Sequence, residues 1–301
     1  MDMTNKLNTK SLFVSIVGKP NVGKSSILNM LVGSKISIIS PKPQTTRNRI
    51  TGILTEGNVQ LVFIDTPGLH NPFSKLGDYM VSEVNNSFSG VEVCMHVVEA
   101  CKHPTEMDLN LIEKFKKFNL KVILAINKID LIKDKSKLME QIQEFSNLFN
   151  YEAVVPMSTI TYEGKSDILE EMKKLAEPSV FFFPEDDITD QTERMLADEI
   201  VREKLLRFLD KELPHGTAVQ IEKFSQRDEN TVDISALIYC ERESHKSIII
   251  GSKGSMIKQV GIDARKSLES ILDTKVNLKL FVKVKDNWRN KASVLHDLGY
   301  C

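Results

Sequence analysis

The 301-residue sequence has few cysteines, few aromatic residues and no long apolar run, and these shortages exclude several classes of protein. The cysteines form no CxxC pair, which argues against a disulfide framework and favours a reduced cytoplasmic protein: Cys94, Cys101, Cys240 and Cys301. The six histidines lack metal-ligand spacing, and His96 lies in an apolar run where we expect a packing role. Because apolar runs reach only about five residues and the start MDMTNKLNTK is polar, we expect neither a membrane span nor a signal peptide.

Apolar segments of strand length alternate with helical patterns from residue 11 to about 177, which predicts an α/β domain with a mainly parallel sheet. Gly57 and Asn58 alone separate the second and third strands. That leaves no room for a helix, so we expect one antiparallel hairpin strand. The expected strands are 12–17, 49–55, 59–64, 91–98, 121–126 and 153–156, and the expected helices are 24–32, 76–88, 107–118, 136–149 and 166–176.

The alternation stops at a stretch with prolines and an acidic cluster, which predicts a linker at 179–190 between domains 1–178 and 191–301. Three phenylalanines at 181–183 indicate that this linker is ordered. The second domain reads as α-β-β-α-α-β, an α+β order. We expect a helix at 191–212, strands at 217–224 and 231–240, a short apolar helix or turn ending at Gly251, a helix at 255–272 and a strand at 275–284.

Charge is unevenly distributed along the chain. The formal net charge of the whole chain is −1, yet residues 244–291 contain 11 basic and four acidic residues, a net charge of +7. A basic segment on an otherwise acidic chain predicts a polyanionic partner for that part of the molecule.

The strongest motif is GKPNVGKS at 18–25, which fits G-x-x-x-x-G-K-[ST] between an expected strand and an expected helix. In such a loop the backbone N–H groups converge on a phosphate. The lysine reaches the β- and γ-phosphates, and the final hydroxyl binds Mg²⁺. We therefore expect nucleotide contacts from Gly18, Lys19, Pro20, Asn21, Val22, Gly23, Lys24, Ser25 and Ser26.

A second motif, DTPG, follows the strand at 59–64. Asp65 at this place can hold Mg²⁺ through water, and the Gly68 N–H can meet the γ-phosphate, with Thr66 and Pro67 between them. On its own the motif would be interpreted as a turn. Its position after a phosphate loop favours the nucleotide site.

A third motif, NKID, ends the strand at 121–126. Guanine presents two adjacent donors that the Asp130 carboxylate can accept side by side, whereas adenine offers no such pair. The Lys128 stem can lie along the base, and Asn127 can tie the neighbouring loops together. The motif therefore predicts GTP as the ligand and argues against an ATP-using P-loop kinase.

These three motifs, in this order, resemble the translation-factor-related class of P-loop GTPases. The resemblance implies that Thr46, in PQTTRNR, binds Mg²⁺ when GTP is present, with Thr45 as the alternative. It also implies that Met157-Ser158-Thr159 forms the remaining base loop, with Thr159 in place of the usual alanine.

The same resemblance bears on catalysis. Leu69 stands where Ras-like enzymes carry a water-orienting glutamine, and Asn21 stands where related GTPases hold K⁺. We expect a GTPase that is slow without K⁺ or a partner. The expected catalytic residues are Lys24, Thr46, Gly68 and Asn21, and the expected cation ligands are Ser25, Thr46 and Asp65 for Mg²⁺ and Asn21 for K⁺.

A weaker glycine motif, GSKG at 251–254, lies between two expected helices. It reads either as a plain turn or as the backbone clamp of a KH domain, and the element order and nearby lysines favour a type II KH domain. The expected RNA-binding residues are Lys246, Ile250, Gly251, Ser252, Lys253, Gly254, Ile257, Lys258, Arg265 and Lys266. Trp288 could stack on a base, but we expect it to anchor the C-terminal segment.

A Ras-like GTPase domain (mixed sheet, one antiparallel strand) followed by a type II KH domain resembles the Era family of bacterial ribosome-assembly GTPases. The resemblance includes FPEDDITD, EIVREKL, IGSKGSMIKQVGIDARK and LFVKVKDNW. It implies GTP-controlled binding to the 3′ end of 16S ribosomal RNA during assembly of the small (30S) subunit, in the cytoplasm, and no DNA partner. A peripheral contact with the cytoplasmic face of the inner membrane is a secondary expectation. The alternative is a constitutive RNA-binding protein with a structural, non-switching nucleotide site.

Overall fold

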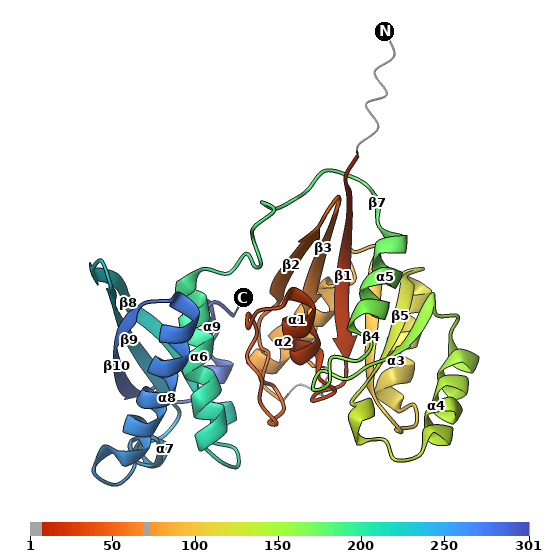
Figure 1. Cartoon of the computed structure of the whole chain (residues 1–301). Coiled ribbons are helices and arrows are strands. Elements are labelled where there is room, and N and C mark those ends of the chain that lie inside the picture. The colour runs from red at the N-terminus through yellow and green to blue at the C-terminus, as the bar shows by residue number, and fades with distance from the viewer. Residues whose placement is uncertain (1–7, 69–72, 301) are drawn as a thin grey trace. The chain divides into compact units, whose positions relative to one another are not determined.

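A computed structural model describes residues 8–68 and 73–300 (Figure 1). The described chain divides into two compact units. The first contains residues 8–37, 46–68 and 80–190, and the second contains residues 38–45, 73–79 and 191–300. Each unit has its own hydrophobic core.

A single mixed sheet forms the centre of the first unit. Its strands run in the order β2-β3-β1-β4-β5-β6, with β7 also paired to β1. The bounds are β1 Lys10–Gly18, β2 Ile50–Glu56, β3 Val59–Asp65, β4 Val93–Glu99, β5 Lys121–Asn127, β6 Ala153–Pro156 and β7 Glu177–Pro178. The predicted hairpin is confirmed, because β2 pairs antiparallel with β3 while β3, β1, β4, β5 and β6 are parallel. The two-residue β7, also antiparallel, was not predicted.

Helices cover both faces of this sheet. Successive side chains of each strand point to opposite faces, so apolar residues on both faces need a covering layer. In β1, Leu12, Val14 and Ile16 share a core with α1 and α5, while Val17 shares a separate core with α2 and α3. Every second residue of a strand points to the same face, so one buried strand supplies both cores. The helices are α1 Lys24–Val32, α2 Lys75–Asn86, α3 Glu106–Lys117, α4 Lys135–Leu148 and α5 Lys165–Leu175.

The second unit has the predicted α-β-β-α-α-β order, followed by a short helix, α9, that was not predicted. Its elements are α6 Glu193–Phe208, β8 Ala218–Asp228, β9 Thr231–Cys240, α7 Glu243–Ile250, α8 Ser255–Leu272, β10 Lys275–Val284 and α9 Ala292–Asp297. The sheet order is β10-β9-β8, with β8 antiparallel and β10 parallel to β9. Val260, Ala264 and Leu268, at helical spacing, form one stripe of α8 that is buried in the core with α6 and the sheet. This stripe fixes which face of α8 remains outside.

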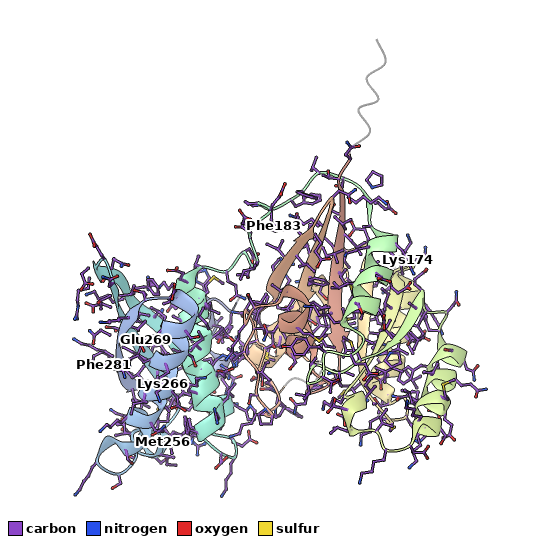
Figure 2. The ribbon with its side chains drawn as sticks, viewed as in Figure 1. Lys174, Phe183, Met256, Lys266, Glu269 and Phe281 are labelled. Atoms are coloured by element: carbon purple, nitrogen blue, oxygen red, sulfur yellow. The ribbon has the colours of Figure 1, made fainter. Side chains whose placement is uncertain are left out.

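The stretch at 179–190, predicted as an ordered linker, is ordered and forms part of the first unit. The Gln60 side chain accepts hydrogen bonds from the backbone of Phe182 and Phe183, at 2.8 and 3.1 Å. The Phe182 ring lies 5.0 Å from that of Phe13, and the Ile53 N–H donates to Ile188. Phe183 is labelled in Figure 2.

Trp288 anchors the C-terminal segment, so the base-stacking alternative is wrong. Its side chain is completely buried, and its indole N–H donates to the Gly216 carbonyl at 2.9 Å. The Tyr300 ring is stacked on it at 6.4 Å. No helix within residues 8–68 and 73–300 is long and apolar enough to cross a membrane.

Candidate nucleotide and RNA sites

The phosphate loop occupies the turn between the end of β1 at Gly18 and the start of α1 at Lys24. Gly18 and Gly23 adopt φ angles of 154° and 104°. A Cβ atom at Gly18 would lie 2.4 Å from the Val97 carbonyl oxygen, and one at Gly23 would lie 2.2 Å from Asn127 Nδ2. Backbone conformation and close packing therefore both require glycine here.

The Lys24 ammonium is buried at the centre of this loop. It donates to the carbonyl oxygens of Gly18 and Lys19, at 3.1 and 3.0 Å. Burial lowers its pKa to about 8, while the charge of Asp65 acts in the opposite direction. A phosphate group would offer this cation a stronger, charged acceptor than the two carbonyls.

Three side-chain oxygens gather where a magnesium ion is expected. The Ser25 hydroxyl lies 2.6 Å from Asp65 Oδ2 and 2.8 Å from the Thr46 hydroxyl. Thr45 instead donates its hydroxyl to the Lys42 carbonyl at 2.6 Å, so Thr46 is the threonine at this site. A carboxylate with two hydroxyls is a donor set that suits Mg²⁺.

The carboxylate of Asp65 is completely buried, and its Oδ1 atom has no hydrogen-bond partner among the described residues. Burial raises its pKa, while the charge of Lys24 and hydrogen bonds from Ser25 and Ser37 act in the opposite direction. An unpartnered buried oxygen is costly unless something binds it. The residues present therefore fit Mg²⁺, which would also favour the ionised carboxylate.

The rest of the DTPG motif packs closely against the phosphate loop. The Thr66 hydroxyl donates to the Ile16 carbonyl at 2.9 Å. A Cβ atom at Gly68 would lie 2.9 Å from Pro20 Cα, so a glycine is needed for this close approach. Leu69, which we expect at the place of the water-orienting residue, lies outside the described residues.

The loops expected to bind the base are linked to each other and to the phosphate loop. Asn127 donates through Nδ2 to the Val22 carbonyl at 2.8 Å, which is the predicted tie. The Ser158 hydroxyl donates to Asp130 Oδ1 at 2.6 Å and accepts the Thr161 N–H at 3.2 Å. This arrangement orients the exposed carboxylate of Asp130 for the two donors of guanine.

The GSKG loop joins α7 to α8 in the second unit. Gly251, Lys253 and Gly254 have φ angles of 74°, 51° and 79°. A Cβ atom at Gly251 would lie 2.7 Å from Met256 Cβ, and the Gly251 N–H caps α7 by donating to the Ser247 carbonyl at 2.9 Å. Ser252 and Lys253 are exposed at its tip. This is a tight, glycine-dependent turn with a cation at its tip, as a backbone clamp requires.

Residues near the loop separate into core and surface. Ile249 is fully buried and Ile248 is 55% exposed, while Ile250 and Ile257 are half-buried. The basic residues of this region are half-buried at Lys246 and exposed at Lys258, Arg265 and Lys266. Figure 2 shows Met256, Lys266 and Glu269 along α8 and Phe281 on β10.

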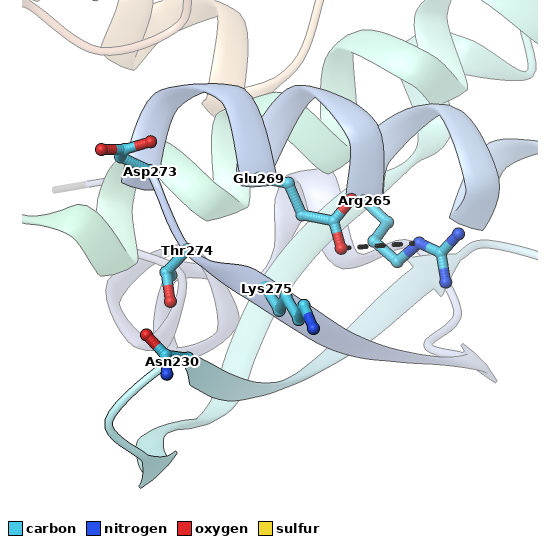
Figure 3. Close-up of a pocket in the computed structure, with 6 residues that line it drawn as sticks. All are labelled: Asn230, Arg265, Glu269, Asp273, Thr274 and Lys275. Carbon is cyan, nitrogen blue, oxygen red and sulfur yellow. Dashed lines mark ion pairs between the residues drawn. The ribbon is translucent and has the colours of Figure 1, made fainter.

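Arg265, one of the expected RNA contacts, has a carboxylate close to it. Its guanidinium lies 3.9 Å from Glu269, one turn away on α8 (Figure 3). Both residues line a shallow hollow with Asn230, Asp273, Thr274 and Lys275. Because the charges of this hollow are mixed, it is a weaker polyanion surface than the GSKG loop.

Comparison with known proteins gives two family matches and close relatives over nearly the full length. A model described as "50S ribosome-binding GTPase" matches residues 13–128, and a model described as "KH domain" matches residues 212–289. GTPase Era of Ruminiclostridium cellulolyticum is 45% identical over 98% of each chain, and GTPase Era of Clostridioides difficile is 44% identical over 97% of this chain and 98% of its own. The chain belongs to the Era family of GTPases.

Solved structures of Era agree with this assignment. Era from Aquifex aeolicus, bound to GDP and AlF4⁻, is 37% identical, covers 97% of this chain and 100% of its own, and has a TM-score of 0.93. A second Era structure, in complex with MgGDPNP and nucleotides 1506–1542 of 16S ribosomal RNA, has a TM-score of 0.92 at 37% identity and covers 97% of this chain and 99% of its own. The predicted fold class, GTPase activity and family resemblance are confirmed.

Membership of the Era family leaves the individual site residues as predictions, and geometry adds two that the motifs did not include. Ser37, completely buried, directs its hydroxyl to Asp65 Oδ2 at 3.4 Å. Glu99 pairs with the Lys128 ammonium at 2.8 Å. Glu99 ends β4, where the carboxyl ends of parallel strands build ligand sites, so its position was a usable signal. Ser37 carries no such signal.

Proposed function

We propose that this chain is a GTP-hydrolysing switch that binds 16S ribosomal RNA near its 3′ end through its KH domain and assists assembly of the small (30S) ribosomal subunit. One observation carries the proposal. A structure in complex with both MgGDPNP and nucleotides 1506–1542 of 16S ribosomal RNA matches 97% of this chain. The phosphate loop and the GSKG loop lie within the two family matches, at 13–128 and 212–289.

In the first unit, each residue of the nucleotide site has a defined task. Lys24 binds the β- and γ-phosphates, the backbone of the phosphate loop surrounds them, and Asp130 selects guanine. Ser25, Thr46 and Asp65 would hold Mg²⁺, which neutralises charge on the phosphates. The Gly68 N–H binds the γ-phosphate. Loss of that phosphate releases the segments around Thr46 and Gly68, which makes the site a switch.

We propose that unaided hydrolysis is slow. Leu69 has no polar atom with which to orient water. Asn21, with a φ of 62° in the phosphate loop, is the residue assigned to K⁺. Rates in KCl and NaCl, measured on the natural chain and on Asn21→Ala, test this assignment. Equal rates in the two salts, or K⁺ stimulation that survives the substitution, would remove it.

In the second unit, the GSKG loop binds the RNA backbone and the flanking basic residues add affinity. Ser252 and Lys253 are exposed, and Ile250 and Ile257 are half-buried next to the loop, where bases can lie. Lys246, Lys258, Arg265 and Lys266 supply charge that makes binding dependent on salt.

The constitutive RNA-binding protein remains the second candidate, but the base loop gives it little support. Thr159 departs from the usual alanine, yet Ser158 still orients Asp130 at 2.6 Å. A Lys24→Ala variant distinguishes the two functions. If it still supports subunit assembly in cells, nucleotide binding serves structure and the switch is excluded.

We place the protein in the cytoplasm, with its basic surface able to touch anionic lipid on the inner face of the membrane. The charge of +7 over residues 244–291 supports that peripheral contact, and it needs no inserted helix. Co-sedimentation with anionic and neutral vesicles tests it, and equal recovery with both would refute it.

RNA footprinting on the small ribosomal subunit tests partner and site together. The experiment compares protein loaded with a non-hydrolysable GTP analogue and protein loaded with GDP. We expect protection at the 3′ end of 16S ribosomal RNA that is stronger with the GTP analogue. Protection elsewhere, or none with either nucleotide, would refute the proposed partner.

A further inference from the structure

A partly buried ion pair connects the phosphate loop to α3. The Lys19 ammonium lies 2.9 Å from Asp108 Oδ2, and the carboxylate is completely buried while the lysine side chain is 19% exposed. The motif assigned Lys19 to the nucleotide. The structure gives its ammonium a partner inside the protein instead. The charge of Lys19 is therefore used to hold the loop, not left free for phosphate.

Several other groups fix the Asp108 carboxylate in place. The same Oδ2 atom accepts hydrogen bonds from the Thr105 N–H and hydroxyl, at 2.8 and 2.7 Å, because Asp108 closes the capping box of α3. On the other side, His96 Nε2 lies 3.4 Å from Oδ1. Burial by itself raises the pKa of Asp108, but the nearby His96 ring and hydrogen bonds from Thr105 and Lys19 outweigh this and hold the pKa well below its usual range.

His96 in turn is fixed by its surroundings. It is completely buried in β4, and its Nδ1 lies 3.2 Å from the Tyr151 hydroxyl. Burial lowers the pKa of His96, so the ring is neutral. With the Tyr151 hydroxyl as the donor, Nδ1 accepts and the ring proton lies on Nε2, the atom 3.4 Å from Asp108 Oδ1. A line of polar groups thus runs through the protein from Tyr151 to Lys19.

Lys19, at the end of this line, lies between two closely packed residues of the phosphate loop. Gly18 before it packs against Val97, and Pro20 after it packs against Gly68. The carbonyl of Lys19 accepts a hydrogen bond from Lys24 at 3.0 Å. Any displacement of Lys19 therefore moves the backbone that must face the phosphates and an acceptor of the catalytic lysine. Small displacements of positioned groups cost much in binding and rate.

We propose that Asp108, oriented by His96 and Thr105, is a positioning residue that preorganises the phosphate loop through Lys19. It touches no nucleotide. The inference rests on the proposed GTP site and explains what holds the phosphate loop of that site in place. Replacing both members of a buried pair often changes stability little, whereas removing one member leaves a buried charge unpaired, so nucleotide affinity is compared only between folded variants.

The test is a double-mutant cycle with Lys19→Met, Asp108→Asn and the double variant. Affinities for MgGDP and a Mg-bound GTP analogue are measured by titration at a temperature where circular dichroism shows each variant folded. We expect each single variant to lose roughly tenfold in affinity and the double variant to lose no more than either. Lys19→Arg should restore most of the affinity, because a guanidinium also pairs with a carboxylate.

The matched control is Glu144→Gln. It breaks a surface pair in which the Glu144 carboxylate lies 2.9 Å from His103 Nδ1. We expect Glu144→Gln to bind nucleotide with the same affinity as the natural chain. If Lys19→Met binds nucleotide as well as the natural chain, the inference is wrong, even where Asp108→Asn does not fold. Losses that add in the double variant would also overturn it. A natural chain that fails to bind GTP would instead refute the proposed function.

Discussion

Asp130→Asn should exchange the base specificity of the nucleotide site. In the structure one carboxylate oxygen of Asp130 accepts the Ser158 hydroxyl at 2.6 Å, and the side chain is exposed at the end of β5. The substitution preserves the shape and the acceptor for Ser158. It replaces the second oxygen by an NH₂ group, which faces a donor of guanine instead of accepting from it. Xanthine carries a carbonyl at that place, which accepts from the new NH₂.

The magnitude follows from the bonds that change. Guanine donates two hydrogen bonds to the carboxylate, and a bond to a charged group contributes about 1.5 to 3 kcal/mol. Asp130→Asn removes one of these two bonds, which costs about 1.5 to 3 kcal/mol, or roughly ten- to a hundredfold in affinity. Affinity for a xanthine nucleotide should rise because the new NH₂ pairs with its carbonyl.

Competition between GTP, XTP and ATP for the site measures this exchange. Asp134→Asn is the matched control, because Asp134 is a nearby carboxylate that caps α4 by accepting the Ser136 N–H at 2.9 Å. We expect Asp130→Asn to prefer XTP and the control to prefer GTP. If Asp130→Asn still prefers GTP, Asp130 does not read the base.

Three further predictions concern separate parts of the molecule. Ser25→Ala should lower the affinity for MgGTP but leave affinity in EDTA unchanged, because it removes a hydroxyl 2.6 Å from Asp65; equal losses in both titrations would contradict the assignment. Lys253→Glu should weaken RNA binding at least tenfold and flatten its salt dependence, whereas Lys174→Glu, a 64% exposed lysine of α5, should not; equal effects would place the RNA elsewhere. His96→Gln should reduce the loss of stability in acid. Burial lowers the pKa of His96 below 6.5, so the unfolded chain takes up a proton that the native chain excludes. That stability is present above pH 6.5 and falls below it by up to about 1.4 kcal/mol per pH unit, so urea melts should show a shallower decline below pH 6.5 for His96→Gln than for the natural chain.

Much of the fold followed from the sequence where periodicity and turn residues agree. The helices at 24–32 and 255–272 and the strands at 231–240 and 275–284 match the structure residue for residue. The helix predicted at 191–212 ends earlier, at Phe208, because Leu209 turns to an extended backbone and Lys211 has a φ of 55°. The prediction was too long because Leu209 and Leu213 continue the apolar pattern. Both side chains are buried in the core, although neither residue lies in the helix.

The parts that could not be predicted depend on contacts between residues distant in sequence. The role of Trp288 is decided by the Gly216 carbonyl, 72 residues away. The choice between Thr45 and Thr46 depends on which hydroxyl reaches Ser25. Asp108 lies 89 residues from Lys19, in a helix whose sequence suggests nothing beyond an amphipathic surface helix. A motif gives the residues of one loop, whereas only the fold shows what holds that loop in place.

The most direct test of the account is the affinity of the full chain for an oligonucleotide from the 3′ end of 16S ribosomal RNA, measured with a non-hydrolysable GTP analogue and with GDP. We expect clearly tighter binding with the GTP analogue. We also expect the difference to disappear in Lys24→Ala while the RNA is still bound. Equal affinities in the two nucleotide states of the natural chain would contradict the switch.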